Sequence, residues 1–271
     1  MGLSVYSRTL CAGIVAWGLA LLGPVIELRA ETPDPSASAG LPRRSAEPFG
    51  LPVAPLTSGG LRDKWLGVQR RLDDEMVQLA LCEGDRDGCV SPAALKFLDI
   101  VDAGKLRYGR ARLGEINRAI NLAIRPMDDL AQHGQIDVWT SPLATFARGA
   151  GDCEDYAIAK FVALRLAGLS TDDIRIVVLH DTIHGDDHAV VAARLDGRWL
   201  TLDNRRMAMV DDSNLRNYRP TFVIDQHDVM RYGDALLADA SGLNLGGSGI
   251  AASLAANSPV DPSLAAPALA N

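Results

Sequence analysis

Three residues in the middle of the chain, Cys153, His188 and Asp203, are of the types that together carry out covalent acyl transfer. A cysteine thiolate is a strong nucleophile, a histidine can take the thiol proton, and a carboxylate can orient that histidine. Each also has an ordinary structural interpretation: a buried apolar cysteine, a solvated loop histidine and an aspartate that ends a strand. The functional interpretation therefore depends on whether the fold brings the three together.

The dipeptide Asp196-Gly197 predicts how His188 and Asp203 are placed. Asp-Gly between two apolar runs favours a two-residue type I′ hairpin, and such a turn fixes the register of its strands. Counting back from the turn, Val190 pairs with Asp203, so His188 and Asp203 lie on one face as diagonal neighbours, roughly 7–8 Å apart at the backbone. A slip of one residue would separate the two side chains.

Cys153 is predicted at the first turn of a helix that runs to Ala167 and ends at Gly168. Asp152 is a suitable N-cap, and Asp155 three residues later would complete an acidic variant of the capping box. The helix carries few charges, which is typical of a central helix covered on nearly all sides. The unpaired N–H groups and the dipole at its N-terminus lower the pKa of a thiol and can stabilise an oxyanion.

Three carboxylates, Asp152, Glu154 and Asp155, flank the thiol and oppose its ionisation. They allow two interpretations. Acids at a helix N-terminus are favourable caps and need no ligand. Alternatively, the three bind a cation that neutralises them, and a set of oxygen ligands suits Ca²⁺. The residues alone leave both interpretations open.

The ends of the chain differ from its middle. Residues 1–30 have a basic start, an almost entirely apolar run and a cleavage motif at Ala30, which predicts a signal peptide that is removed on export. An uncleaved membrane anchor is the alternative, although the run is short and broken by glycine and proline. Proline-rich residues 31–60 predict a disordered linker, and residues 234–271, rich in alanine, serine and glycine, predict a disordered tail. One folded domain remains at 61–233.

Cysteine usage and net charge restrict the class of protein. Cys82 and Cys89 enclose a short polar segment and predict a disulfide, which leaves Cys153 as the free thiol of the exported protein. The 271-residue chain has a formal net charge of −7 and no basic stripe, which disfavours binding to nucleic acid.

The order of elements predicts an α+β domain. Apolar residues recur at helical spacing in three segments of its first half, at about 66–80, 92–101 and 113–124. Runs typical of strands follow the Cys153 helix, at 174–179, 188–195, 198–203 and 221–224. Helices first and strands afterwards indicate a largely antiparallel sheet packed against the helices.

The stretch Gly149-Ala-Gly-Asp-Cys-Glu-Asp-Tyr-Ala-Ile-Ala-Lys160 resembles the bacterial transglutaminase-like cysteine peptidases, the family that includes the LapG-type periplasmic proteases. Shorter matches lie at 118–125, 137–142, 188–191 and 202–204. The resemblance implies a papain-like, transglutaminase-like α+β fold with the nucleophile at the N-terminus of a central helix. It implies the triad Cys153, His188 and Asp203. It also implies calcium near the nucleophile, with Asp152, Glu154 and Asp155 at the matching positions.

The resemblance also implies an activity and partners. Members of the LapG type cleave large calcium-binding adhesins at a small-residue site, and some are controlled by an inner-membrane receptor that senses a cyclic dinucleotide. We therefore expect a periplasmic, calcium-dependent cysteine endopeptidase that acts on a cell-surface or periplasmic protein. The alternatives are a transglutaminase that transfers the acyl group to an amine, and a non-catalytic calcium-binding module of the same fold. The chain departs from the family's Trp-x-x-Pro-x-Glu pattern at Ala144, where the pattern has an acid.

Overall fold

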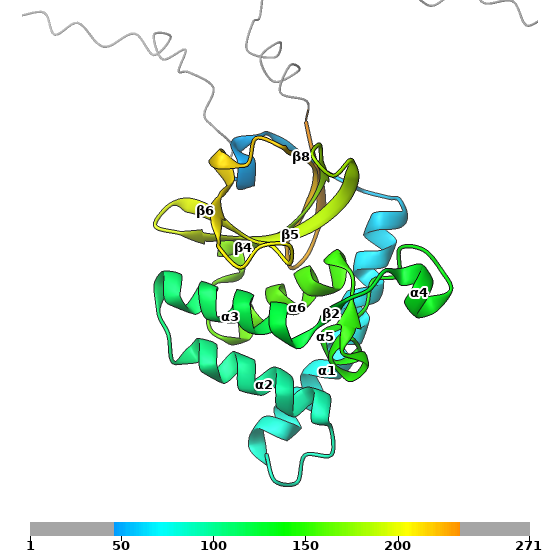
Figure 1. Cartoon of the computed structure of the whole chain (residues 1–271), viewed down its shortest axis with the longest axis vertical. Helices are drawn as coiled ribbons and strands as arrows, with labels where there is room; N and C mark the ends of the chain where they lie inside the picture. The colour runs from blue at the N-terminus through cyan, green and yellow to red at the C-terminus, as the bar shows by residue number, and fades with distance from the viewer. Residues whose placement is uncertain (1–45, 234–271) are drawn as a thin grey trace, which may run out of the picture. The chain divides into compact units, whose positions relative to one another are not determined.

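The computed structural model describes residues 46–233. In it the first half of the domain is helical, as its apolar periodicity predicted. Its helices are α1 (Gly60–Gly84), α2 (Pro92–Lys105), α3 (Gly109–Ala123), α4 (Asp129–His133) and α5 (Pro142–Arg148) (Figure 1). At the start of α2, the Ser91 hydroxyl accepts a hydrogen bond from the N–H of Ala94, and Pro92 occupies the first helical turn. The short helices α4 and α5 were not predicted, because helices of two turns or fewer show no apolar period. Within the described range, no helix is both long and apolar enough to cross a membrane.

The strands of the second half, together with β1 from before α1, form a seven-stranded antiparallel sheet in the order β1-β9-β8-β4-β5-β6-β7. Its strands are β1 (Val53–Pro55), β4 (Ile174–Asp181), β5 (Asp186–Leu195), β6 (Arg198–Leu202), β7 (Val210–Asp211), β8 (Tyr218–Ile224) and β9 (Val229–Tyr232). A short parallel pair joins β2 (Arg125–Pro126), which follows α3, to β3 (Ala150–Gly151), which comes directly before the central helix α6 (Cys153–Leu166). The α+β fold class is therefore confirmed.

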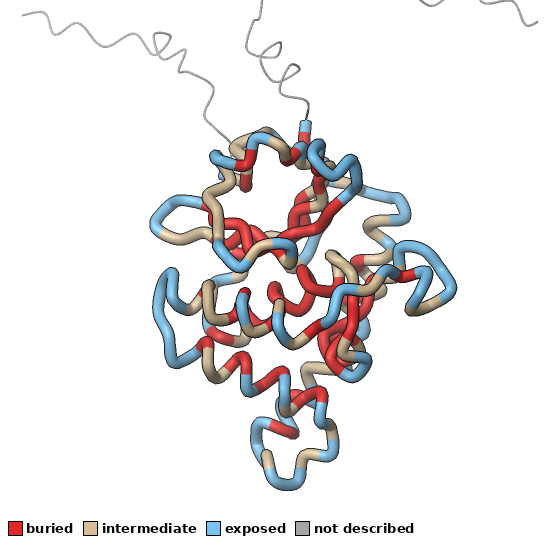
Figure 2. The backbone as a smooth tube through the Cα atoms, in the orientation of Figure 1, coloured by how far each residue is buried: buried red, intermediate tan, exposed pale blue. Residues whose placement is uncertain are grey.

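Helix α6 lies at the centre of the main core, between the sheet and the other helices. Every residue from Asp155 to Leu164 is buried, which confirms the prediction of a helix covered on nearly all sides. Phe161 of α6 packs edge-on against Trp65 of α1, with ring centroids 5.9 Å apart. Figure 2 shows buried residues running along α6 and along the strands that face it. The catalytic candidate at the start of this helix is thus fixed by the best-packed element of the domain.

The predicted start of the domain at residue 61 is wrong, because part of the expected linker is folded. Strand β1 pairs with β9, with Val53 opposite Tyr232, and closes one edge of the sheet. Phe49, Leu51 and Val53 pack on a second apolar cluster, which lies on the sheet face turned away from α6. Proline content suggested a linker, but an edge strand tolerates proline since one side of its backbone is unpaired. The predicted signal peptide 1–30, the rest of the linker and the tail 234–271 lie outside the described residues.

Candidate active site

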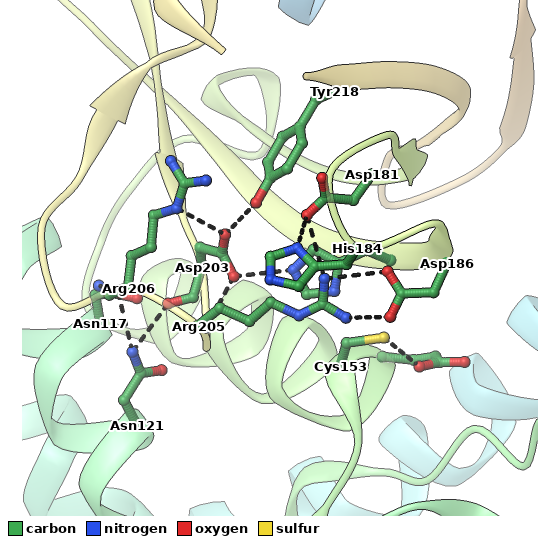
Figure 3. Close-up of polar contacts among 12 residues, drawn as sticks. Asn117, Asn121, Cys153, Asp181, His184, Asp186, Asp203, Arg205, Arg206 and Tyr218 are labelled. Atoms are coloured by element: carbon green, nitrogen blue, oxygen red, sulfur yellow. Dashed lines mark hydrogen bonds and ion pairs between the residues drawn. The ribbon is translucent and has the colours of Figure 1, made fainter. Parts of the chain in front are cut away.

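The hairpin places His188 and Asp203 together as the Asp-Gly turn predicted. Strands β5 and β6 pair with Leu195 opposite Arg198, which confirms the register. The two turn residues have φ of 51° and 75°, as a type I′ turn requires. His188 Nε2 lies 2.9 Å from Asp203 Oδ1 in a contact that is closed to solvent. Figure 3 shows Asp203 with other residues that contact its carboxylate, among them Tyr218 and Arg206.

Three donors hold the Asp203 carboxylate. Besides His188, the hydroxyl of Tyr218 donates to Oδ2 at 2.5 Å, and the backbone N–H of Arg205 donates to Oδ1 at 2.9 Å. Burial by itself raises the pKa of Asp203, but the hydrogen bond and charge of His188, with the Tyr218 hydrogen bond, outweigh it and lower the pKa to about 2. Asp203 is therefore ionised at neutral pH. No sequence pattern pointed to Tyr218, which comes from β8.

The state of Asp203 determines which nitrogen of His188 can act as a base. An ionised carboxylate only accepts hydrogen bonds, so in neutral His188 the Nε2 atom carries the hydrogen. The Nδ1 atom then presents its lone pair. It is buried and has no hydrogen-bond partner within the described part of the chain. Nδ1 is thus the atom available to take a proton.

Cys153 begins α6, as predicted, and lines the same cavity as His188, a hollow of about 620 Å³. In the resting arrangement its thiol donates a hydrogen bond to Glu154 Oε2 at 2.8 Å. Burial first, and then the charge of Glu154, raise the pKa of the thiol well above its usual value. A hydrogen bond from the backbone N–H of Ala189, the residue after His188, opposes this rise. The lowering of the thiol pKa that was expected from the helix N-terminus is therefore outweighed. The prediction that the neighbouring acids oppose ionisation of the thiol is confirmed in direction.

The acidic group beside Cys153 has a different membership from the predicted one. Carboxylate oxygens of Asp129, Asp152 and Asp155 lie within 4.8 Å of one another. Glu154 is not part of this group, and its carboxylate faces the thiol instead. Asp129 was not foreseen because it belongs to the short helix α4, which no periodic pattern announces. The structure thus brings two of the three predicted carboxylates together and adds one from another element.

This group has the properties of a cation site. Each member has a buried carboxylate oxygen that accepts no hydrogen bond from the described residues, namely Asp129 Oδ1, Asp152 Oδ1 and Asp155 Oδ2. Burial, and after it the charges of the neighbouring acids, raise the pKa of Asp152 to about 9, and burial also raises the pKa of Asp155. Buried carboxylates in contact are costly unless a proton or a cation neutralises them. An all-oxygen set suits a hard cation such as Ca²⁺.

The predicted capping box at the start of α6 is wrong. In the described structure the Asp152 side chain accepts no hydrogen bond from the helix. Asp155 is fully buried and its Oδ1 instead accepts from the N–H and the hydroxyl of Thr140, at 2.9 and 2.7 Å. Asp155 thus binds the neighbouring loop at Thr140, and both acids belong to the acidic group instead of capping the helix.

At the start of α5, which includes Ala144, a carboxylate of another helix accepts hydrogen bonds. Glu75 of α1 accepts hydrogen bonds from the Ser141 hydroxyl at 2.5 Å and from the N–H groups of Leu143 and Ala144 at 3.0 and 3.3 Å. These groups form the first turn of α5, where unpaired N–H groups need an acceptor. Glu75 therefore anchors the turn next to Thr140, which in turn holds Asp155.

The cavity in front of Cys153 and His188 combines apolar walls with a row of carboxylates. The apolar side chains are Leu61, Leu130, Ile136, Trp139, Val178 and Phe222. The acidic ones are Asp128, Asp129, Asp137, Asp152, Glu154 and Asp187. No lysine or arginine is among the described residues that line it. An extended peptide with acidic side chains would therefore meet like charge there.

Comparison with known proteins places these features in a family. Residues 79–228, slightly more than half of the 271-residue chain, match the family model described as bacterial transglutaminase-like cysteine proteinase BTLCP. Among solved structures, Legionella pneumophila LapG is 22% identical over 70% of this chain and 98% of its own, with a TM-score of 0.48. The calcium-bound form of that protein is 22% identical over 52% and 81% of the two chains, with a TM-score of 0.47. No curated protein matches the chain.

Proposed function

Because the chain belongs to the bacterial transglutaminase-like cysteine proteinases, we propose that this cysteine protease cleaves peptide bonds with Cys153 as the nucleophile, His188 as the base and Asp203 as the residue that orients His188. The observation that carries the assignment is the buried His188–Asp203 pair. Nδ1 of His188 has no hydrogen-bond partner among the described residues, and His188 lines the same cavity as Cys153. A nucleophile, a base and an orienting group around one cavity are the parts that covalent acyl transfer needs.

In the proposed reaction, His188 Nδ1 takes the proton of the Cys153 thiol, and the thiolate attacks the carbonyl carbon of the scissile bond. The N–H groups at the start of α6 are available to stabilise the oxyanion. The C–N bond then breaks, His188 gives its proton to the leaving amine, and a thioester to Cys153 remains. A water molecule, deprotonated by His188, attacks the thioester, which releases the new carboxyl terminus and regenerates the thiol.

We further propose that Asp129, Asp152 and Asp155 hold Ca²⁺, a set in which Asp129 takes the place expected for Glu154. Their unpaired buried oxygens and their mutual proximity support this. When bound, the cation would neutralise acids that otherwise disfavour the thiolate. It would also join α4 to the first turn of α6, since Asp129 lies on one and Asp155 on the other.

The proposal includes export and an extracytoplasmic protein substrate. Besides the expected signal peptide, it is supported by the bond between Cys82 and Cys89, whose Cα atoms are 4.8 Å apart, because such bonds persist mainly in oxidising compartments. The acidic cavity favours a substrate segment that lacks acidic side chains at the cleavage site. The family resemblance extends the proposal to a large surface adhesin as that substrate, and to control by an inner-membrane receptor.

Cleavage of exported surface proteins tests the proposed function. The purified protease is incubated with surface proteins of the same cells, in Ca²⁺ or in chelator, and new termini are identified by mass spectrometry. We expect fragments that form only in Ca²⁺ and not with Cys153→Ala, with a free carboxyl group at the new C-terminus. Asp129→Asn should weaken Ca²⁺ binding in calorimetry while the circular dichroism spectrum stays unchanged. Identical fragments from the wild type and from Cys153→Ala would refute the nucleophile, and undiminished Ca²⁺ affinity in Asp129→Asn would refute the cation site.

A further inference from the structure

The segment that carries Asp203 leaves the sheet just where it contacts His188. Strands β5 and β6 are paired as far as Val191 and Leu202, and the backbone turns directly afterwards, since the N–H of Arg206 donates to the backbone oxygen of Asp203 at 3.4 Å. The ladder of backbone hydrogen bonds therefore stops short of His188 and Asp203. Contacts of side chains, and not the ladder, determine how this turn lies against the start of β5.

The side chain of Arg205 joins this turn to both ends of the β4–β5 connection. Its Nη1 and Nη2 atoms donate to the two carboxylate oxygens of Asp186, the first residue of β5, at 3.2 and 2.6 Å. Nη1 also donates to Oδ2 of Asp181, the last residue of β4, at 3.3 Å. Figure 3 shows the Arg205 side chain extending toward these two carboxylates. A guanidinium binds a carboxylate through two parallel hydrogen bonds, which fix its orientation as well as its position.

Arg205 also contacts the catalytic candidates through its backbone. Its N–H donates to Asp203 Oδ1 at 2.9 Å, which is the same oxygen that His188 Nε2 contacts. Asp186, which the side chain binds, precedes His188 by two residues on β5. One residue thus holds the Asp203 carboxylate by its backbone and the strand of His188 by its side chain.

Asp181 is a fixed point for this contact. The residue is fully buried, and its carboxylate accepts hydrogen bonds from the N–H of Ile183 at 3.0 Å and from the Asn217 side chain at 2.8 Å. Nδ1 of His184 lies 2.6 Å from its Oδ2. Asp181 keeps these partners when Arg205 is replaced, so the change leaves no buried carboxylate without hydrogen bonds.

The ion pair between Arg205 and Asp186 is partly open to solvent, with side chains 29% and 48% exposed. Pairs of this kind contribute little to stability. Loss of the Arg205 side chain therefore affects the arrangement of the site more than the stability of the domain, and the two effects can be measured separately.

We propose that Arg205 is a positioning residue: its guanidinium ties the turn after Asp203 to Asp181 and Asp186, and so keeps the Asp203 carboxylate in contact with His188. The proposal rests on the roles assigned above to His188 and Asp203. Arg205 is not among the described residues that line the cavity in front of Cys153. It therefore acts through Asp203 and His188, and it does not touch the substrate.

Arg205→Met tests this role, because methionine keeps an unbranched side chain and removes the ion pairs. The kcat for peptide cleavage should fall between about 10- and 100-fold, with KM changed less than about twofold, as expected for a misplaced catalytic group. The matched control is Arg194→Met. Arg194 lies near the other end of β5, binds Asp173 at 2.7 Å and is 33% exposed. Both variants should shift the urea midpoint of unfolding by a similar small amount, and an unchanged kcat in Arg205→Met would overturn the inference.

A double-mutant cycle with Asp186→Ala tests whether the contact itself is responsible. If Arg205 acts by binding Asp186, the kcat of the double variant should lie within about twofold of that of Arg205→Met alone. Losses that multiply would show that the two residues act independently, against the inference. If Arg205→Met does not fold, Asp186→Ala, which removes a half-exposed side chain, is measured alone against the same criteria.

A second readout does not depend on activity. In protein labelled with ¹⁵N-histidine, NMR of the wild type should show His188 with its hydrogen on Nε2, bound to Asp203. Arg205→Met should show exchange between the two tautomers of His188, whereas Arg194→Met should give the wild-type signal. If the wild type cleaves no protein, the proposed function fails, while this signal still tests Arg205. A folded Arg205→Met with an unchanged His188 signal would overturn the inference whatever its activity.

Discussion

Replacing Asp203 by Asn tests the buried His188–Asp203 pair in both stability and activity. Asp203 is 2% exposed and its pKa is about 2, against about 3.9 for an unfolded aspartate. Since each pKa unit corresponds to about 1.4 kcal/mol, ionised Asp203 contributes about 2–3 kcal/mol to the free energy of unfolding at neutral pH. Its folded pKa is the lower one, so this contribution is complete above about pH 5 and is lost as the pH falls through about 2.

The assay is urea unfolding of the wild type and of Asp203→Asn, followed by circular dichroism between pH 7 and pH 2. The difference in free energy of unfolding should be constant from pH 7 to about pH 5 and should shrink by about 2 kcal/mol below that. Asp99→Asn is a matched control, because the Asp99 side chain is 79% exposed and should give a small difference. A difference between wild type and Asp203→Asn that does not change with pH would refute the reasoning.

Two variants of Asp203 separate its role in orienting His188 from the effect of its negative charge on the reaction. In Asp203→Asn the amide oxygen can still accept the hydrogen of His188 Nε2, whereas the alanine side chain of Asp203→Ala cannot. We therefore expect kcat to fall moderately in Asp203→Asn and by about 10³-fold or more in Asp203→Ala. Equal rates in the two variants would show that the carboxylate does not orient His188.

Three further predictions concern the supports of the site. Tyr218→Phe removes a hydrogen bond to Asp203, so kcat in steady-state cleavage should fall severalfold with KM unchanged; an unchanged kcat would contradict this. Glu75→Gln removes the charged acceptor at the start of α5 and should lower the free energy of unfolding by about 1–2 kcal/mol in urea, unlike Glu83→Gln at an exposed ion pair. Replacing Cys82 and Cys89 together by serine should cost about 2–3 kcal/mol, the value for a loop this short; an unshifted unfolding midpoint would contradict it.

The parts of the fold that could be predicted are those set by local sequence. The Asp196-Gly197 turn determined the register of β5 and β6, so the contact between His188 and Asp203 followed from counting residues. The central helix followed from its continuous apolar character. Both signals lie within the element that they predict, and no distant contact was needed to interpret them.

The parts that could not be predicted depend on contacts between distant segments. Asp129 joins the acidic group from α4, and Tyr218 reaches Asp203 from β8. The linker prediction failed at β1 because a proline-rich segment became an edge strand only through pairing with β9. In the sequence Lys160 is one of a few charges on an apolar helix, and only the fold shows that this lysine is buried.

The central claim, that Cys153 is an activated nucleophile, is tested most directly by the rate at which its thiol is alkylated. Cys82 and Cys89 are bonded to each other, so Cys153 is the free thiol of the described part, and labelling near neutral pH can be located by mass spectrometry. With Ca²⁺ present, we predict that Cys153 reacts at least about tenfold faster than an exposed cysteine in a peptide. Chelator, which uncovers the acids, and His188→Ala should each remove most of this excess in a protein that remains folded. A rate equal to that of the peptide in Ca²⁺, or one unchanged by His188→Ala, would contradict the account.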